Sequence, residues 1–78
     1  MLKLELDILG TVYKAESENI ADGLLELNVP KILKFGILRV KDGKKKAELK
    51  VNPRQINRCR FNELTRQILQ KRINLMLK

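Results

Sequence analysis

The segment from Gly36 to Val51, GILRVKDGKKKAELKV, restricts the fold more than any other part of the chain. Apolar and charged residues alternate along two runs, and Asp42-Gly43 between them is a strong signal for a two-residue hairpin loop. This loop places Lys41 opposite Lys44. One face of the hairpin then carries the apolar residues Leu38, Val40, Ala47, Leu49 and Val51. A three-residue loop would mix lysines into that apolar face, so we expect the two-residue register.

A second hairpin is predicted at the N-terminus, where LKLELDILGTVYKAE alternates with a period of two residues. If Leu9-Gly10 forms a two-residue loop, Glu5 faces Lys14, and apolar pairs form on the opposite face. Leu9 is poorly suited to the positive φ that a type I′ turn requires. A three-residue loop therefore stays open as the competing register.

Each hairpin is followed by a predicted helix. For the first helix, Ser17 is the expected N-cap and Pro30 prevents continuation. Gly23 lowers the intrinsic stability of this helix by about 1 kcal/mol relative to alanine. The apolar stripe that should cover the sheet consists of Ile20, Leu24 and Leu27.

The second helical region opens at Asn52-Pro53, with Gln55 at the capping-box position. The apolar phase breaks between Cys59 and Phe61, which predicts a kink or two helices, with Asn62 as a second cap. Residues 73–78 also alternate, so the sequence fits either helix or strand there. The order ββαββα predicts an α+β fold in a single domain, residues 1–78. We expect a four-stranded, mostly antiparallel sheet of two hairpins, with helices packed on one face.

Charge is distributed unevenly along the 78 residues. Residues 1–40 carry a net charge of −1 and residues 41–78 a net charge of +9, which points to an anionic partner for the second half. The like charges of Arg39 and Lys46, expected to lie opposite each other, would destabilise an isolated hairpin. Glu5 and Asp7 would neutralise them if the first strand lies alongside; otherwise the side chains are solvated or contact an anion. The candidate basic contact face consists of Arg39, Lys41, Lys44, Lys45, Lys46, Lys50, Arg54, Arg58 and Arg60.

Catalytic chemistry has little support in the composition. The chain has no histidine and a single cysteine, so it lacks an imidazole base and a thiolate zinc site. We expect Cys59 to be a buried, neutral thiol, and we expect no enzyme activity, no cofactor, no metal and no small-molecule substrate. The N-terminus does not resemble a signal peptide, and no apolar run has the length of a membrane span. The expected location is the cytoplasm, or a larger particle of which the chain is a part.

The last helix carries a broad apolar arc that contains Leu64, Ile68, Leu69, Ile73, Leu75 and Met76. Arg72 lies within this arc, so either its stem packs and its head reaches water, or the arc is partly an interface. Arg72 and Met76 are the candidate protein-interface residues. Aromatic residues are scarce, and Tyr13 is expected to face the core. A nucleic acid would therefore be bound through its phosphates rather than by base stacking.

The segments GILRVKDGKKKAELKVNPRQINR and LTRQILQKRINLML resemble small proteins encoded by tailed phages and prophages. The resemblance covers about two-thirds of the chain. It implies a viral origin and a small accessory role, with a location in the cytoplasm of a bacterial host or in a virion. It carries over no functional residue.

Three functions remain. The first is a non-enzymatic interaction or assembly module that docks onto another protein or onto itself, because a core of this size rarely supplies more than about 3–5 kcal/mol. The second is a sequence-tolerant nucleic-acid-binding protein that uses the basic hairpin face and helix. The third is an inhibitor of an acidic host protein.

Overall fold

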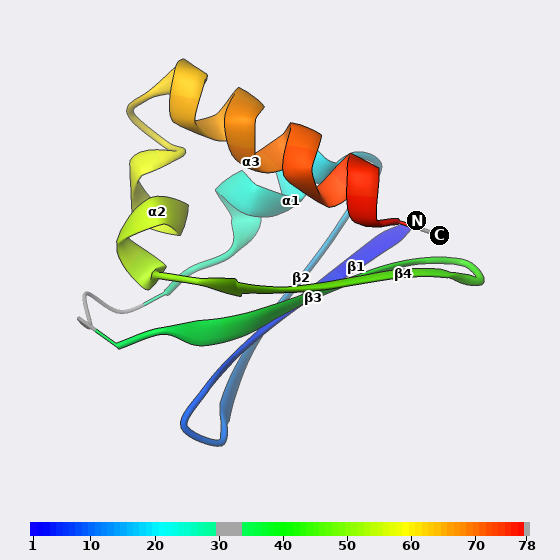
Figure 1. Ribbon diagram of the computed structural model, residues 1–78, viewed down its shortest axis with the longest axis horizontal. Helices are drawn as coiled ribbons and strands as arrows, with labels where there is room; N and C mark the ends of the chain where they lie inside the picture. The colour runs from blue at the N-terminus through cyan, green and yellow to red at the C-terminus, as the bar shows by residue number, and fades with distance from the viewer. Residues whose placement is uncertain (30–33, 78) are drawn as a thin grey trace.

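The computed structural model describes residues 1–29 and 34–77, and it has four strands and three helices in these segments (Figure 1). The elements are β1 (Leu2–Ile8), β2 (Thr11–Ser17), α1 (Ile20–Glu26), β3 (Gly36–Asp42), β4 (Lys45–Val51), α2 (Pro53–Arg58) and α3 (Glu63–Met76). The predicted α+β class is confirmed, with an antiparallel sheet and the helices on one side. The second predicted helical region is two separate helices.

The sheet has the order β2-β1-β3-β4, with every neighbouring pair antiparallel. The predicted two-residue register of the first hairpin is confirmed, since Glu5 lies opposite Lys14. Leu9 and Gly10 both have positive φ, 52° and 90°. Leu9 therefore adopts the left-handed conformation that the sequence argued against.

The predicted register of the second hairpin is wrong by two residues. Its loop is Gly43-Lys44 rather than Asp42-Gly43, so that Lys41 lies opposite Lys46 and Arg39 opposite Glu48. Gly43 has a φ of 62°, as in a type II′ turn, which takes glycine at its first central position. The observed register replaces a like-charge pair at Arg39 with an ion pair. Because the shift is even, every side chain keeps its predicted face.

Helix ends follow the caps in the sequence, with one correction. Asn19, not Ser17, caps α1, and its Oδ1 accepts a hydrogen bond of 2.9 Å from the Asp22 amide. Ser17 is the last residue of β2, where pairing with Leu2 fixes it. The helix ends at Glu26, and the expected stop at Pro30 lies outside the described residues.

The predicted capping box of α2 is confirmed, since the Asn52 amide donates to Gln55 Oε1 over 3.1 Å. The predicted second cap is confirmed too, because Asn62 Oδ1 accepts from the Thr65 amide. Residues 73–76 are helical and Leu77 caps α3, which decides between helix and strand for this stretch. Residue 78 is outside the description.

The core lies between the sheet and the three helices. The residues of the core that come from the strands are Leu2, Leu4, Leu6, Ile8, Leu38, Val40, Ala47, Leu49 and Val51. The helices and their caps contribute Ile20, Leu24, Leu27, Ile56, Cys59, Leu69 and Ile73. Tyr13 packs partly buried against this cluster, as predicted. The other side of the sheet, called here the open face, is not covered by the helices (Figure 1).

Candidate interaction surfaces

The positive charges at the centre of the open face are neutralised by carboxylates of the sheet itself. Across the four strands, Lys14, Glu5, Arg39 and Glu48 lie side by side with alternating sign. Arg39 Nε lies 3.1 Å from Glu48 Oε2, and its Nη1 lies 3.7 Å from Asp7 Oδ2. Arg39, a predicted contact residue, is thus held by carboxylates of the chain. The expected neutralisation by the first strand is realised here through Asp7.

One row of the open face is not compensated in this way. Lys3, Lys41 and Lys46 lie directly opposite one another across β1, β3 and β4, and we call them the lysine row. Glu16 faces Lys3 from β2. The ion pairs among the described residues are Arg39–Asp7, Arg39–Glu48 and Arg66–Glu63, so none involves the row. Like charges directly opposite on neighbouring strands repel.

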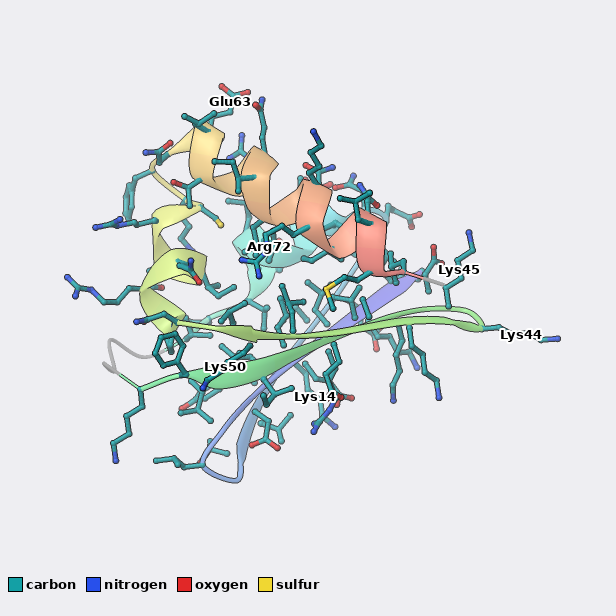
Figure 2. The ribbon with its side chains drawn as sticks, in the orientation of Figure 1. Lys14, Lys44, Lys45, Lys50, Glu63 and Arg72 are labelled. Carbon is teal, nitrogen blue, oxygen red and sulfur yellow. The ribbon has the colours of Figure 1, made fainter. Side chains whose placement is uncertain are left out.

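The remaining hairpin lysines point in different directions. Lys44 extends from the tip of the β3–β4 turn, whereas Lys45 points to the side of the sheet that carries the helices (Figure 2). Lys50 Nζ lies 5.0 Å from the centre of the Phe35 ring, within cation–π range. The predicted hairpin contact residues therefore do not form a single face.

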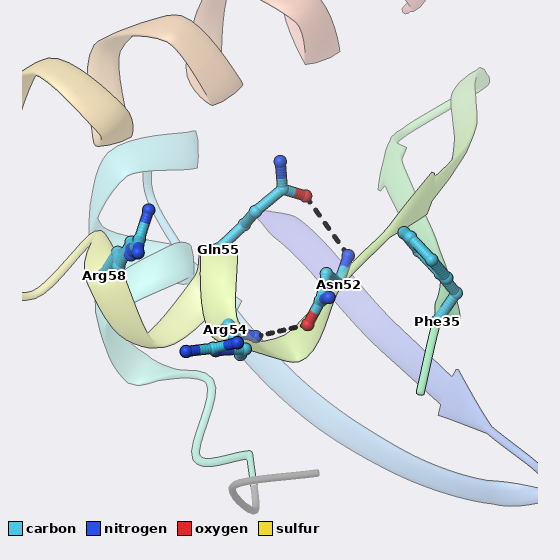
Figure 3. Close-up of a pocket in the computed structure, with 5 residues that line it drawn as sticks. All are labelled: Phe35, Asn52, Arg54, Gln55 and Arg58. Atoms are coloured by element: carbon cyan, nitrogen blue, oxygen red, sulfur yellow. Dashed lines mark hydrogen bonds between the residues drawn. The ribbon is translucent and has the colours of Figure 1, made fainter. Parts of the chain in front are cut away.

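A hollow of 270 Å³ lies where β4 meets α2 (Figure 3). It is lined by Phe35, Asn52, Arg54, Gln55 and Arg58. The side chains of Asn52 and Gln55 form the helix cap, whereas Arg54 and Arg58 are exposed. Two of the three predicted helix arginines, Arg54 and Arg58, thus lie on one open rim. Arg60 is separate from them, because its Nη2 donates to the Leu27 carbonyl over 3.1 Å and fastens the α2–α3 turn to the end of α1.

The outer face of α3 carries an apolar stripe that consists of Leu64, Ile68 and Leu75. Their exposed fractions are 65%, 54% and 70%, whereas only Leu69 and Ile73 of the predicted arc are buried. On a helical wheel the three residues fall within about 40° of one another. Phe61, just before the helix, is almost fully exposed as well.

Arg72 borders the stripe, in line with its predicted position inside the apolar arc. Its side chain, labelled in Figure 2, is exposed. It lines a second hollow, of 240 Å³, between α2 and α3. Ile68 belongs to both the stripe and this hollow, whose remaining lining residues are Gln55, Arg58, Thr65 and Leu69. Met76, the other predicted interface residue, is partly exposed on the neighbouring side of the helix.

Cys59 is fully buried, as expected, and its Sγ lies 3.1 Å from the Gln55 carbonyl oxygen. Burial raises the pKa of the thiol above its ordinary value, and the positive charge of Arg66 opposes this rise only in part. The thiol is therefore neutral at pH 7 and a poor nucleophile.

Sequence reasoning missed two parts of these surfaces. Lys3 was not among the predicted contact residues, since only the pairing of β1 with β3 brings it beside Lys41. The stripe was predicted as part of an apolar arc, without a division into buried and exposed halves. The width of the arc was the available signal, because one helix cannot bury all of it against a sheet.

In residues 1–29 and 34–77 no group of three or more His, Cys, Asp or Glu side chains is placed to hold a metal ion. No helix of the described chain has the length and apolar character needed to cross a membrane. Comparison of the chain with protein-family models, curated proteins and solved structures gives no match. The resemblance to phage proteins therefore stays a prediction.

Proposed function

We propose that this chain is a non-enzymatic docking module that binds another protein through the outer face of α3. The apolar stripe is the observation that carries this proposal. Burying a leucine or isoleucine side chain contributes about 1.5–3 kcal/mol, so three such residues held in water are a large reserve of binding free energy. Contiguous exposed apolar patches on small proteins mark interaction sites.

The spacing of the stripe indicates how a partner would fit. Leu64, Ile68 and Leu75 follow the helical repeat, as do the anchors of a helix that docks against another protein. The hollow beside Ile68 continues the apolar surface towards α2. A partner helix or groove would therefore contact both the ridge of α3 and the hollow beside it.

The charges around the stripe favour an acidic partner over a second copy. Arg58, Lys71 and Arg72 are all exposed on α2 and α3. The acidic residue of α3 is Glu63, whose Oε1 lies 4.0 Å from Arg66 Nη2. A symmetric pair of α3 helices would bring these cations together with little negative charge between them. An acidic partner would instead neutralise them, and Arg72 would add a directional contact beside the apolar anchors.

The test compares two variants of the full chain. The stripe variant is Leu64→Gln/Ile68→Gln/Leu75→Gln, and the control is Gln67→Ala/Asn74→Ala on the exposed polar side of the same helix. Each is used to capture proteins from a bacterial lysate, and the captured protein is purified and titrated by calorimetry. The stripe variant should bind at least about 100-fold more weakly, since each lost anchor costs about 1.5–3 kcal/mol. The control should bind like the wild type.

Self-association is measured in parallel by sedimentation velocity over a wide protein concentration range. A dimer that the stripe variant abolishes would assign the face to a second copy and overturn the acidic partner. Equal capture and equal mass for the wild type and the stripe variant would overturn the docking function itself.

A further inference from the structure

We infer that the lysine row, together with Lys44 at the adjoining turn, binds the phosphate backbone of duplex nucleic acid. This inference is independent of the proposed docking function, because it concerns the open face of the sheet rather than α3. Its basis is that three lysines lie directly opposite one another, whereas in the register of Arg39 each charge lies opposite one of the other sign.

The row concentrates positive charge in a small area. Neighbouring strands lie about 4.8 Å apart, so Lys3, Lys41 and Lys46 start within about 10 Å of one another on one face of the sheet. All three are exposed, as is Lys44 at the turn. Two residues further along the strands, on the same face, the sheet places Arg39 beside Glu48. Anionic groups of a ligand would relieve a repulsion that is elsewhere relieved by carboxylates of the chain.

The kind of anion follows from what surrounds the row. The apolar residues that the four strands place on the open face, Val12 and Ile37, lie in the register of Asp7, towards the opposite end of the strands. Within the strands, the row therefore has no neighbouring apolar anchor of the kind that protein interfaces and membrane-binding surfaces use. Lysine is depleted in the centres of protein interfaces but is a common contact for phosphates.

The position of the row suits a long, regular polyanion. The β3–β4 turn reaches beyond the C-terminal end of α3 (Figure 1), so a rod-like ligand can lie across the hairpin without meeting the helices. Phe35 carries Lys50 over its ring at the end of β4 that is distant from the row. Base stacking is therefore not part of this contact, and binding is expected to be independent of sequence.

The test is fluorescence anisotropy with two labelled 30-base-pair duplexes of unrelated sequence, titrated with the full chain at several salt concentrations. Four phosphate contacts give a slope of log K against log salt of about −3.6. Affinity should therefore fall about 150-fold between 50 and 200 mM salt, equally for both duplexes.

Two variants of equal net charge separate the row from general attraction. Lys41→Gln/Lys46→Gln removes two charges from the row. Lys14→Gln/Lys50→Gln removes two from elsewhere on the open face. The row variant should flatten the slope by about 1.8, and the control should leave it nearly unchanged. Without ligand, the row variant should also be at least as resistant to urea as the wild type, because a repulsion is removed.

Three results would overturn the inference. The first is no duplex binding at 20 mM salt. The second is an equal change of slope in both variants, which would indicate that net charge alone attracts DNA. The third is that poly-glutamate or vesicles with 30% phosphatidylserine bind the row as tightly as the duplex does.

Discussion

Replacing Gly23 by alanine tests whether packing or helix propensity governs α1. Alanine in place of glycine inside a helix stabilises it by about 1 kcal/mol. However, Gly23 is buried, and an added Cβ would overlap Leu4 Cδ1 and lie 2.8 Å from Ser17 Oγ. Leu4 is fully buried, so it cannot swing away. Ser17 is held by a hydrogen bond from its hydroxyl to the Asn19 carbonyl.

Overpacking of this kind costs about 1–3 kcal/mol, which exceeds the gain in propensity. We therefore expect Gly23→Ala to lower the free energy of unfolding by about 1 kcal/mol net. Urea denaturation followed by circular dichroism measures this change. Ala21→Gly, at a half-buried position of the same helix, measures how much the difference in helix propensity between alanine and glycine contributes in α1.

The clash itself can be isolated with a double-mutant cycle. If Leu4 is the obstacle, Gly23→Ala should be much less harmful when combined with Leu4→Val, so the two effects should not add. A Gly23→Ala variant that is more stable than the wild type would refute the packing argument. It would mean that helix propensity, and not packing against Leu4 and Ser17, determines the effect of this substitution.

Two other substitutions probe particular sites. Leu9→Asn should stabilise the chain by about 1 kcal/mol. Leu9 has a φ of 52° and is 77% exposed, so the substitution relieves backbone strain without loss of packing. An unchanged urea midpoint would contradict this prediction. The pKa of the Cys59 thiol is raised in the folded chain, whereas in the unfolded chain it is about 8.5. Just above this pH the thiol is therefore still protonated in the folded chain but already deprotonated in the unfolded chain. The contribution of this thiol to the free energy of unfolding should therefore be constant below that pH and decrease above it. Urea midpoints measured from pH 7 to pH 9.5 should decline less in Cys59→Ala than in the wild type, and parallel curves would contradict the burial argument.

The sequence predicts the local elements well because each has a local cause. Alternation alone indicates both hairpins, and Asn52 with Gln55 is sufficient to start α2. The second hairpin shows the limit of such signals. Asp42-Gly43 is the better loop by composition, but the observed loop gives Val40 an apolar partner, Ala47, and Arg39 an acidic partner, Glu48. The pairing of seven residues on each strand therefore outweighs the turn preference of the two residues Asp42 and Gly43.

The candidate surfaces are less predictable because they depend on contacts between distant segments. Nothing in either hairpin determines that β1 pairs with β3, and only this pairing places Lys3 beside Lys41. Similarly, the sequence cannot tell which half of the α3 arc is buried until the position of the helix over the sheet is known. Leu69 and Ile73 face the core, whereas Ile68 does not.

The fold also explains why the two proposals concern separate parts of a very basic chain. Several arginines have structural roles, since Arg39 binds carboxylates and Arg60 and Arg66 donate to backbone carbonyls. The charge that remains is divided by the sheet. The lysine row lies on the open face, while Arg72 and the stripe belong to α3 on the side of the helices. A partner on one side leaves the other accessible, so the chain could hold a protein and a nucleic acid together.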